Sequence, residues 1–228
     1  METKISDIFF DLDHTLWDFE TNSALAFREI FGTNNVAVDL DEFLLHYVPI
    51  NLKYWELYQY DKITQSELRY GRLKDAFDAT GYQIEDDLIH VLSAEYIRCL
   101  PQFNHLFEGT AEILEYLSKK YRLHIITNGF HDIQGSKLRN SKIDHYFNTI
   151  TNSETAGVKK PHPQIFEYAL KQANTQKERC LMIGDNLEAD VLGALKCGFD
   201  AIHFTPGKSG TNQDIKSIAH LLHLKEYL

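Results

Sequence analysis

Short apolar runs in this sequence begin near the N-terminus, stop for a long stretch and then return at regular intervals. The first run is Ile5–Phe10, and the next begins only at Leu123. Runs of this length fit buried strands, and helical patterns lie between the later ones. Strands that alternate with helices predict an α/β fold with a parallel sheet and right-handed crossovers. The later strands are predicted at 123–127, 149–151, 180–183 and 201–204, and the helices at 110–120, 163–173 and 187–197.

Residues from about 20 to 98 show helical spacing in place of a second strand. Apolar positions recur three and four residues apart, as in helices with one buried face. These positions include Phe43, Leu44, Tyr47, Leu68, Leu73, Phe77, Leu88, Val91 and Leu92, and Gly32, Pro49 and Gly81 punctuate the stretch. We therefore predict a catalytic core made of residues 1–17 and 99–228, with a helical cap domain, residues 18–98, inserted after the first strand.

The charge of the chain limits the partners that it can bind. Its 228 residues include 33 Asp and Glu against 23 Lys and Arg, a formal net charge of −10. Long nucleic acids need a basic face, so we expect no such partner. Small phosphorylated substrates remain compatible with an acidic protein, because one bound metal ion can invert the local field.

Cysteine usage and hydropathy bear on the compartment. Cys99, Cys180 and Cys197 are sparse and show no CxxC spacing, which fits neither a disulfide framework nor a zinc site. No apolar stretch approaches the ~18 residues of a membrane span, and residues 1–4 show no signal-peptide pattern. We expect a cytoplasmic protein without a membrane partner, either monomer or homodimer. The eleven histidines show no zinc spacing and are interpreted as surface residues.

Two carboxylates, Asp11 and Asp13, follow the first predicted strand directly. They would repel each other unless a cation lies between them, and Mg²⁺ prefers oxygen ligands. A carboxylate can also attack phosphorus as a nucleophile, while a second one protonates the leaving oxygen. Asp is equally common in the turn at the end of a strand, so this pair alone decides nothing.

Two later segments place further polar groups near strand ends. Thr127-Asn128-Gly129 offers a hydroxyl and backbone N–H groups that can hold phosphate oxygens, although a simple turn is the more ordinary explanation for this motif alone. Lys160 can neutralise a nucleophile and a bound phosphate, and a solvated lysine is the alternative. Pro161 restricts the backbone of Lys160 and is expected to start the next helix.

The fourth segment is Gly184-Asp185-Asn186-Leu187-Glu188-Ala189-Asp190. Asp185 ends a predicted strand and Asp190 falls in the first turns of the following helix. Both can serve as helix caps. They can equally complete a metal site, Asp185 directly and Asp190 through water.

The ordered set of these four motifs resembles the haloacid dehalogenase-like superfamily over essentially the whole chain. The resemblance implies a Rossmann-like three-layer α/β/α core with a helical cap, and Mg²⁺ as cofactor. It implies that Asp11 is the nucleophile and that Asp13 is the general acid and base. It also implies phosphoryl binding by Thr127, Asn128 and Lys160, and Mg²⁺ binding by Asp11, the Asp13 carbonyl and Asp185, with Asp190 in support.

Asp13 bears on the choice of reaction within this superfamily. Its dehalogenases lack the second aspartate, because halide leaves without a proton, whereas a phosphate ester needs one. The resemblance therefore implies a phosphatase, and a phosphomutase with the same core stays open. A phospho-receiver domain also forms an aspartyl-phosphate, but its acceptor follows the third strand and its chain is about half as long. A purely scaffolding protein is a further alternative, and it would show no hydrolysis.

The sequence is most similar to the bacterial pyrimidine 5'-nucleotidase branch of the superfamily. Residues 16–19, 63–64, 71–72, 126–130 and 165–170 carry this resemblance, together with Asn51–Trp55 and Tyr58-Gln59 in the cap. It implies a pyrimidine nucleoside monophosphate as substrate; phosphoglycolate or a sugar phosphate is the alternative. Asn51, Trp55 and Arg72 are the candidate substrate contacts. Aromatic residues of the early cap, Trp17, Tyr54, Trp55, Tyr58 and Tyr60, either stack on a base or form the cap core.

Overall fold

The computed structural model describes residues 5–207 and 215–228. Residues 1–4, on which the signal-peptide expectation rests, lie outside this range. The chain forms two compact units, one running up to Phe19 and resuming at Asn104–Leu228, the other Glu20–Phe103. The domain boundaries expected from the sequence, at 17/18 and 98/99, lie slightly earlier in the chain and stay a prediction.

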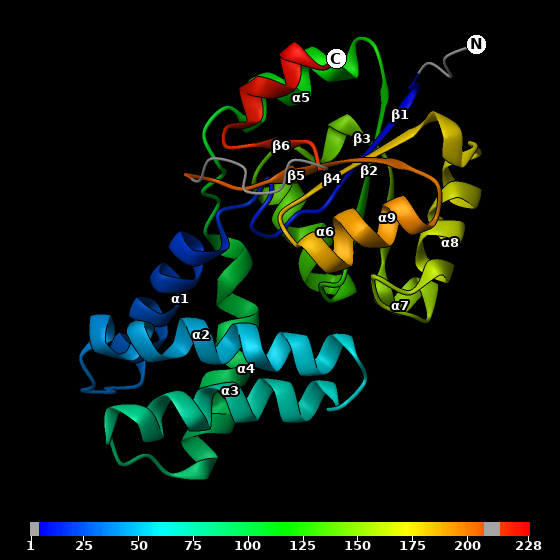
Figure 1. The fold of residues 1–228 in the computed structure, drawn as a ribbon. Coiled ribbons are helices and arrows are strands. Elements are labelled where there is room, and N and C mark those ends of the chain that lie inside the picture. The colour runs from blue at the N-terminus through cyan, green and yellow to red at the C-terminus, as the bar shows by residue number, and fades with distance from the viewer. Residues whose placement is uncertain (1–4, 208–214) are drawn as a thin grey trace. The chain divides into compact units, whose positions relative to one another are not determined.

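A six-stranded sheet forms the centre of the first unit, with strand order β3-β2-β1-β4-β5-β6 (Figure 1). Every neighbouring pair is parallel, which confirms the predicted class. The last strand was not predicted, because two residues are too few for a periodicity signal. The strands are β1 Asp7–Phe10, β2 Arg122–Thr127, β3 Phe147–Asn152, β4 Cys180–Gly184, β5 Asp200–Phe204 and β6 Ser217–Ile218.

Helices cover both faces of this sheet, so the predicted three-layer core is confirmed. Figure 1 shows α5 (Thr110–Ser118) and the C-terminal 3₁₀ helix Leu221–Glu226 on one side of the strands, with α8 (Pro163–Ala173) and α9 (Gly193–Lys196) on the other. The remaining helices of the unit are α6 His131–Asn140, α7 Ser153–Ala156 and short 3₁₀ turns at Asp144–Tyr146 and Lys177–Arg179. One buried cluster joins α8 to the sheet and includes Phe9, Ile126, Phe166, Met182 and Val191.

The single helix predicted over 187–197 is wrong in detail. The chain first forms a π-helical segment, Leu187–Leu192, and α9 then continues from Gly193 to Lys196. The N–H of Val191 donates to the carbonyl of Asn186, five residues back, which is the π-type bond that widens a turn. Hydrophobic spacing cannot resolve this widening, because the same face stays buried.

The register of the central strands decides where the polar motifs meet. Phe10 of β1 lies opposite Ile125 of β2 on one side and Ile183 of β4 on the other. The residues that follow these three strands therefore come out at one edge of the sheet. The chain crosses to the other side of β1 between β3 and β4, and such a switch point is where open parallel sheets bind ligands.

The second unit contains helices, as predicted. They are α1 Phe19–Thr33, whose first residue belongs to the first unit, α2 Leu40–Gln59, α3 Gln65–Thr80 and α4 Asp86–Cys99, followed by a 3₁₀ turn at Leu100–Gln102. Aromatic rings form its core: Phe27 packs on Phe43, Tyr47 and Tyr96, and Phe43 also packs on Phe77.

One histidine contradicts the expectation of surface positions. His124 lies on β2 and is fully buried, with Nε2 3.1 Å from Asp7 and Nδ1 2.8 Å from Thr149. Burial lowers the pKa of His124, against the opposing effect of Asp7. The two polar partners allow an imidazole to stand among the apolar residues of a central strand.

Candidate active site

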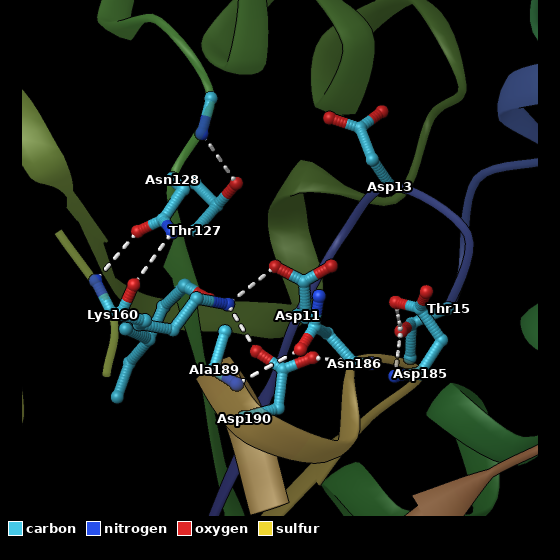
Figure 2. A network of polar contacts seen from close by, with 12 residues as sticks. Asp11, Asp13, Thr15, Thr127, Asn128, Lys160, Asp185, Asn186, Ala189 and Asp190 are labelled. Atoms are coloured by element: carbon cyan, nitrogen blue, oxygen red, sulfur yellow. Dashed lines mark hydrogen bonds and ion pairs between the residues drawn. The ribbon is translucent and has the colours of Figure 1, made fainter. Parts of the chain in front are cut away.

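The ammonium group of Lys160 lies at the centre of the polar residues that follow β1, β2 and β4 (Figure 2). Its Nζ is 2.6 Å from Asp11 Oδ1, 2.6 Å from Asp190 Oδ1 and 2.6 Å from the carbonyl oxygen of Ile126. An ammonium has three N–H donors, and these three oxygens match them. Although burial acts to lower the pKa of Lys160, the charges of Asp11 and Asp190 outweigh it and raise that pKa.

The side chain of Asn128 holds the backbone of Lys160 from both sides. Asn128 Nδ2 donates to the Lys160 carbonyl at 3.0 Å, and the Lys160 N–H donates to Asn128 Oδ1 at 2.7 Å. The resemblance implied a role for the Asn128 backbone at the phosphoryl group, which stays a prediction. The contact in the structure is a different one, because it links the end of β2 to the lysine segment.

The expectation that Pro161 starts the next helix is wrong. Helix α8 begins at Pro163, and His162 is its N-cap, with the ring accepting the N–H of Gln164 at 3.3 Å. Proline suits the first helical position because it has no N–H to leave unpaired and its φ is already helical. The helix predicted over 163–173 is therefore confirmed, and Pro161 lies in the turn that precedes it.

Asp11 is buried at the end of β1, with 7% of its surface exposed. Its backbone N–H donates to the carbonyl of Ile183 at 2.9 Å, which continues the β1–β4 pairing beyond the strand. Burial raises the pKa of Asp11 well above its ordinary value, against the lowering effect of Lys160, and Asp190 and Asp185 raise it further. The charged carboxylate thus needs more positive charge than Lys160 supplies.

Asp185 is fixed at the end of β4 by Thr15. The Thr15 hydroxyl donates to Asp185 Oδ1 at 3.1 Å and accepts the Asp185 N–H at 3.0 Å. Burial raises the pKa of Asp185 to about 7, and the charge of Asp190 adds to the rise. Gly184 before it has no space for a side chain, because a Cβ there would collide with the carboxylate of Asp190.

Asp190 lies close to the other two carboxylates, and the water-mediated role expected of it stays a prediction. Asp11, Asp185 and Asp190 each offer a carboxylate oxygen, and these oxygens all lie within 4.8 Å of one another. Asp190 Oδ2 also accepts the N–H of Asn186, the N-cap residue of the π-helical segment, at 3.0 Å. The widened turn therefore brings Asp190 back to the strand end.

This group of three carboxylates fits a divalent cation. When ionised they carry three negative charges against the single charge of Lys160, so one divalent cation would balance the group. Carboxylate oxygens are the ligands that Mg²⁺ prefers, and phosphate and water complete its octahedron. Asp11, Asp185 and Asp190 are the side chains available to hold the ion, and the carbonyl of Asp13 stays a predicted ligand.

Asp13 points away from this group (Figure 2), and its carboxylate contacts two residues of α6. Lys137 Nζ lies 2.5 Å from Asp13 Oδ1, and Gln134 Nε2 donates to Asp13 Oδ2 at 2.8 Å. The sequence reasoning missed both residues. Their spacing of three on the helix after Thr127-Asn128-Gly129 was the signal available, since such residues share a helix face.

Thr127 ends β2, and its side chain is fully buried. Its hydroxyl oxygen accepts the N–H of Gly129 at 3.0 Å and the amide of Gln134 at 2.7 Å. The structure thus brings Asp11, Asp13, Thr127, Asn128, Lys160, Asp185 and Asp190 to the same strand ends, as the motif order led us to expect.

The three cap candidates lie in the second unit. Arg72 donates to Asn51 Oδ1 at 2.8 Å, and both side chains are only 2% exposed. The guanidinium of Arg72 also lies 5.2 Å from the centre of the Tyr96 ring. Trp55 is half-buried and packs edge-on against Tyr58. The structure thus brings Asn51 and Arg72 together, and a substrate role for the three stays a prediction.

Trp17 does not belong with the cap aromatics. It falls in the first unit and is fully buried, with Lys137 Nζ 4.2 Å from the centre of its ring. The backbone N–H of Trp17 donates to the carbonyl of Leu12, which folds the chain after β1 into a tight turn. The ring therefore packs against the Lys137 ammonium that also contacts Asp13, and a stacking role for it stays a prediction.

Comparison with known proteins gives a family match over most of the chain. Residues 7–198 match the family described as haloacid dehalogenase-like hydrolase. The chain is 33% identical to pyrimidine 5'-nucleotidase PynA of Streptococcus pneumoniae, over 87% of this chain and 83% of PynA. It is 32% identical to pyrimidine 5'-nucleotidase YjjG of Escherichia coli, over 84% of this chain and 82% of YjjG.

A solved structure has the same fold over nearly the full length. The magnesium-bound crystal structure of the HAD-hydrolase YfnB from Bacillus subtilis superposes with a TM-score of 0.87 at 28% identity, covering 98% of both chains. Other relatives of similar identity carry different substrates in their names. They are glyceraldehyde 3-phosphate phosphatase of Pyrococcus abyssi, 32% identical over 90% of this chain and 83% of its own, and phosphoglycolate phosphatase of Colwellia psychrerythraea, 30% identical over 88% and 84%.

Proposed function

Because the chain belongs to the haloacid dehalogenase-like hydrolases, we propose that it is a Mg²⁺-dependent phosphatase that hydrolyses small phosphomonoesters through a phosphorylated Asp11. One observation carries this proposal. Lys160 contacts Asp11 Oδ1 in a group of three carboxylates whose oxygens lie within 4.8 Å of one another, a spacing that fits one divalent cation. A nucleophile, a fixed positive charge and a cation site are what an in-line phosphoryl transfer needs.

In the first step, Asp11 attacks the phosphorus atom of the ester. Lys160 contacts Oδ1, and we assign the attack to Oδ2. The bond from Asp11 to phosphorus forms while the bond to the leaving oxygen breaks, and the carboxyl proton of Asp13 passes to that oxygen. Proton transfer of this kind contributes about 10²–10⁴-fold in rate.

In the second step, water cleaves the phosphoaspartate. Asp13, now ionised, takes a proton from the water as the oxygen attacks phosphorus, and the bond between phosphorus and Asp11 breaks. Inorganic phosphate leaves, and both carboxyl groups return to their starting states. Asp13 therefore acts as acid and then as base, with no net consumption of protons by the enzyme.

Thr127 and Lys160 bind the phosphoryl oxygens in this proposal. Among the described residues, Lys160 Nζ already contacts oxygens of Asp11, Asp190 and Ile126. A contact from Lys160 to substrate therefore requires it to give up one of them. Asp11, Asp185 and the carbonyl of Asp13, with Asp190 in support, would hold Mg²⁺, which would supply positive charge next to the phosphoryl oxygens.

Asp13 also favours the phosphatase over the other reactions of the superfamily. Dehalogenases lack the second aspartate, whereas this chain has it and holds both of its oxygens. A phosphomutase would use the same core, and it would return the phosphoryl group to a second substrate instead of releasing it. Release of inorganic phosphate in a single-substrate assay separates the two.

For the substrate, we propose a pyrimidine nucleoside 5'-monophosphate. The similarity to PynA and YjjG supports this choice, and the cap residues Asn51, Trp55 and Arg72 are the proposed contacts. A buried guanidinium beside an amide offers donors that match the carbonyl oxygens of a pyrimidine. The alternative is a smaller phosphate ester, because two other relatives are named for glyceraldehyde 3-phosphate and phosphoglycolate.

A substrate panel tests the choice between these esters. Released phosphate is measured with Mg²⁺ for UMP, dUMP, dTMP, AMP, phosphoglycolate, glyceraldehyde 3-phosphate and a hexose phosphate. We expect the highest kcat/KM for one of the pyrimidine nucleotides. A clear preference for phosphoglycolate, glyceraldehyde 3-phosphate or the hexose phosphate would overturn the nucleotidase proposal and leave the phosphatase proposal standing.

Asp11→Asn tests the nucleophile itself. The amide has nearly the same shape but does not attack phosphorus, so kcat should fall at least about 10³-fold while the fold is retained. Asp132→Asn, an exposed carboxylate at the start of α6, is the matched control and should keep wild-type activity. Near-normal Mg²⁺-dependent turnover of the Asp11 variant would show that the mechanism is wrong.

The expected cytoplasmic location and the expected monomer or homodimer stay predictions. Among the described residues no helix is long and apolar enough to cross a membrane. The three cysteines are unpaired, and Cys99 and Cys180 are buried.

A further inference from the structure

Lys137 is a buried lysine to which the proposed function has so far given no role. It lies on α6, is 2% exposed and has its Nζ 2.5 Å from Asp13 Oδ1. The same nitrogen lies 4.2 Å from the centre of the Trp17 ring and 5.4 Å from that of Phe19. Two aromatic rings and one carboxylate thus fix the ammonium in place.

Gln134 stands one turn earlier on the same face of α6 and is 1% exposed. Its Nε2 donates to Asp13 Oδ2 at 2.8 Å and to the hydroxyl of Thr127 at 2.7 Å. The opposite orientation of the amide would place its oxygen against the carboxylate, so the network sets the orientation. A Cβ on Gly129 would collide with this amide, so only glycine leaves the space that Gln134 occupies.

The two contacts of Gln134 have separate consequences. On one side, Gln134 and Lys137 each contact one oxygen of Asp13, so the carboxylate cannot rotate without breaking a contact. On the other side, the Thr127 hydroxyl accepts from Gln134 and from the N–H of Gly129. A hydroxyl has two acceptor positions and one proton, and with both positions occupied its proton is left to donate.

We propose that Gln134 and Lys137 are positioning residues of the phosphoryl transfer. Lys137 and Gln134 orient Asp13 for proton transfer, and Gln134 also turns the hydroxyl of Thr127 into a donor for a phosphoryl oxygen. The inference rests on the proposed function, since it assigns Asp13 to proton transfer and Thr127 to phosphoryl binding. Helix α6 then connects the acid and the phosphoryl site through a single rigid turn.

A structural role alone is the alternative, and the ion pair does not decide between the two. A buried ion pair is weak support for a role in stability, because the desolvation of both charges offsets their attraction. A purely structural pair would lower stability, and it would affect all substrates equally. Positioning of an acid affects only those steps in which a proton moves.

Lys137→Met tests the contact with Asp13, because methionine keeps the apolar stem between the rings and removes the ammonium. Two substrates are compared: the best ester from the panel, whose alkoxide needs a proton to leave, and p-nitrophenyl phosphate, whose phenolate leaves without one. On the panel ester, kcat should fall about 10²-fold with KM within about threefold of wild type.

On p-nitrophenyl phosphate the same variant should show a burst. The first turnover should keep a rate within about threefold of wild type, because the phenolate leaves unprotonated. Steady-state turnover should fall about 10²-fold, because hydrolysis of the phosphoaspartate still needs Asp13 as base. Equal losses in the first turnover for both substrates would overturn the role of Lys137.

Gln134→Met is the second variant, and it should affect binding as well as turnover. It removes the donor to Thr127 and the donor to Asp13 together, so KM should rise about tenfold while kcat falls about tenfold. A fall in kcat with KM unchanged would overturn the role of Gln134 at Thr127. This variant keeps its charge balance, so it tests the inference even if Lys137→Met does not fold.

Arg139→Met, an exposed cation on α6, is the matched control, and thermal unfolding of all variants reports stability separately. If the wild type releases phosphate and both variants match Arg139→Met in kcat and KM, the inference fails and the proposed function stands. If the wild type releases no phosphate from any ester, the proposed function fails and the inference fails with it.

Discussion

Lys160 illustrates how a residue with an ambiguous sequence context acquires a definite role. In the sequence it is one of two adjacent lysines before a proline, and a solvated side chain is the favoured explanation for that pair alone. In the structure it is 2% exposed, and Asn128 holds its backbone from a segment more than thirty residues earlier. The ammonium then has no freedom to leave Asp11 and Asp190 without breaking short contacts.

Lys160→Met should therefore destabilise the protein as well as inactivate it. Removal of the ammonium leaves Asp11 and Asp190 buried without a counter-charge, and breaking such a pair costs about 3–5 kcal/mol. Urea unfolding at neutral pH without Mg²⁺ measures the loss, with exposed Lys171→Met as control. The loss should shrink when Mg²⁺ is added. An unfolding free energy equal to that of the control would contradict the account of the charge cluster.

At the scale of elements, the strand ends are organised by pairing and the cap by its own helix signals. β1 lies between β2 and β4, so three motifs that are far apart in the sequence meet at one edge. In the cap, helix α3 begins with a reciprocal cap between Thr64 and Glu67. The Thr64 side chain accepts the Glu67 N–H at 3.2 Å, and Glu67 Oε2 accepts the Thr64 N–H at 2.7 Å.

Thr64→Ala tests how much this cap contributes to the second unit. Loss of the side-chain acceptor leaves the N–H of Glu67 without its partner, and we expect a loss of about 1 kcal/mol of unfolding free energy. The melting temperature should fall by about 2–4 °C for a chain of this size. Ser66→Ala, exposed in the same first turn, is the control. A Thr64 variant as stable as that control would show that the cap contributes nothing measurable.

At the scale of the whole molecule, the charge cluster links stability to pH and to metal. The pKa of Asp185 is raised to about 7, and that of Asp11 is also raised, so the folded protein keeps protons that the unfolded chain releases above about pH 4. Without metal, stability from this cluster is therefore fully present at low pH and declines as pH rises toward 7. His124 acts in the opposite direction, because its lowered pKa favours the folded state as pH rises toward 6.5.

We expect Mg²⁺ to stabilise the protein more at pH 7.5 than at pH 5. The cation binds the ionised carboxylates, so it gains affinity as Asp185 and Asp11 lose their protons. Melting temperatures with Mg²⁺ and with EDTA are compared at both pH values. The difference between the melting temperatures with Mg²⁺ and with EDTA reports on the carboxylate cluster alone, because His124 contacts Asp7 and not this cluster. An equal Mg²⁺ effect at both pH values, or none at either, would argue against a cation among these carboxylates.

The fold class and most of the candidate site could be predicted from the sequence, because both depend on local patterns. Short apolar runs and helical spacing reflect local burial, and the four polar motifs stand within a few residues of strand ends. Parallel pairing of the strands then places these motifs at one edge of the sheet, independently of the contacts between their side chains. The predicted family follows from the same motifs, and it is confirmed by the match over residues 7–198.

Tertiary structure alone decided the contacts that join distant segments. Asn128 grips the backbone of Lys160, Gln134 and Lys137 hold Asp13, and His124 is buried against Asp7. Each depends on the register and crossing of separate elements, which local spacing does not encode. The widened turn that brings Asp190 to Asp11 and Asp185 is of the same kind. Sequence therefore determined which groups reach the sheet edge, and packing determined which of them touch, because contact distances follow from long-range geometry.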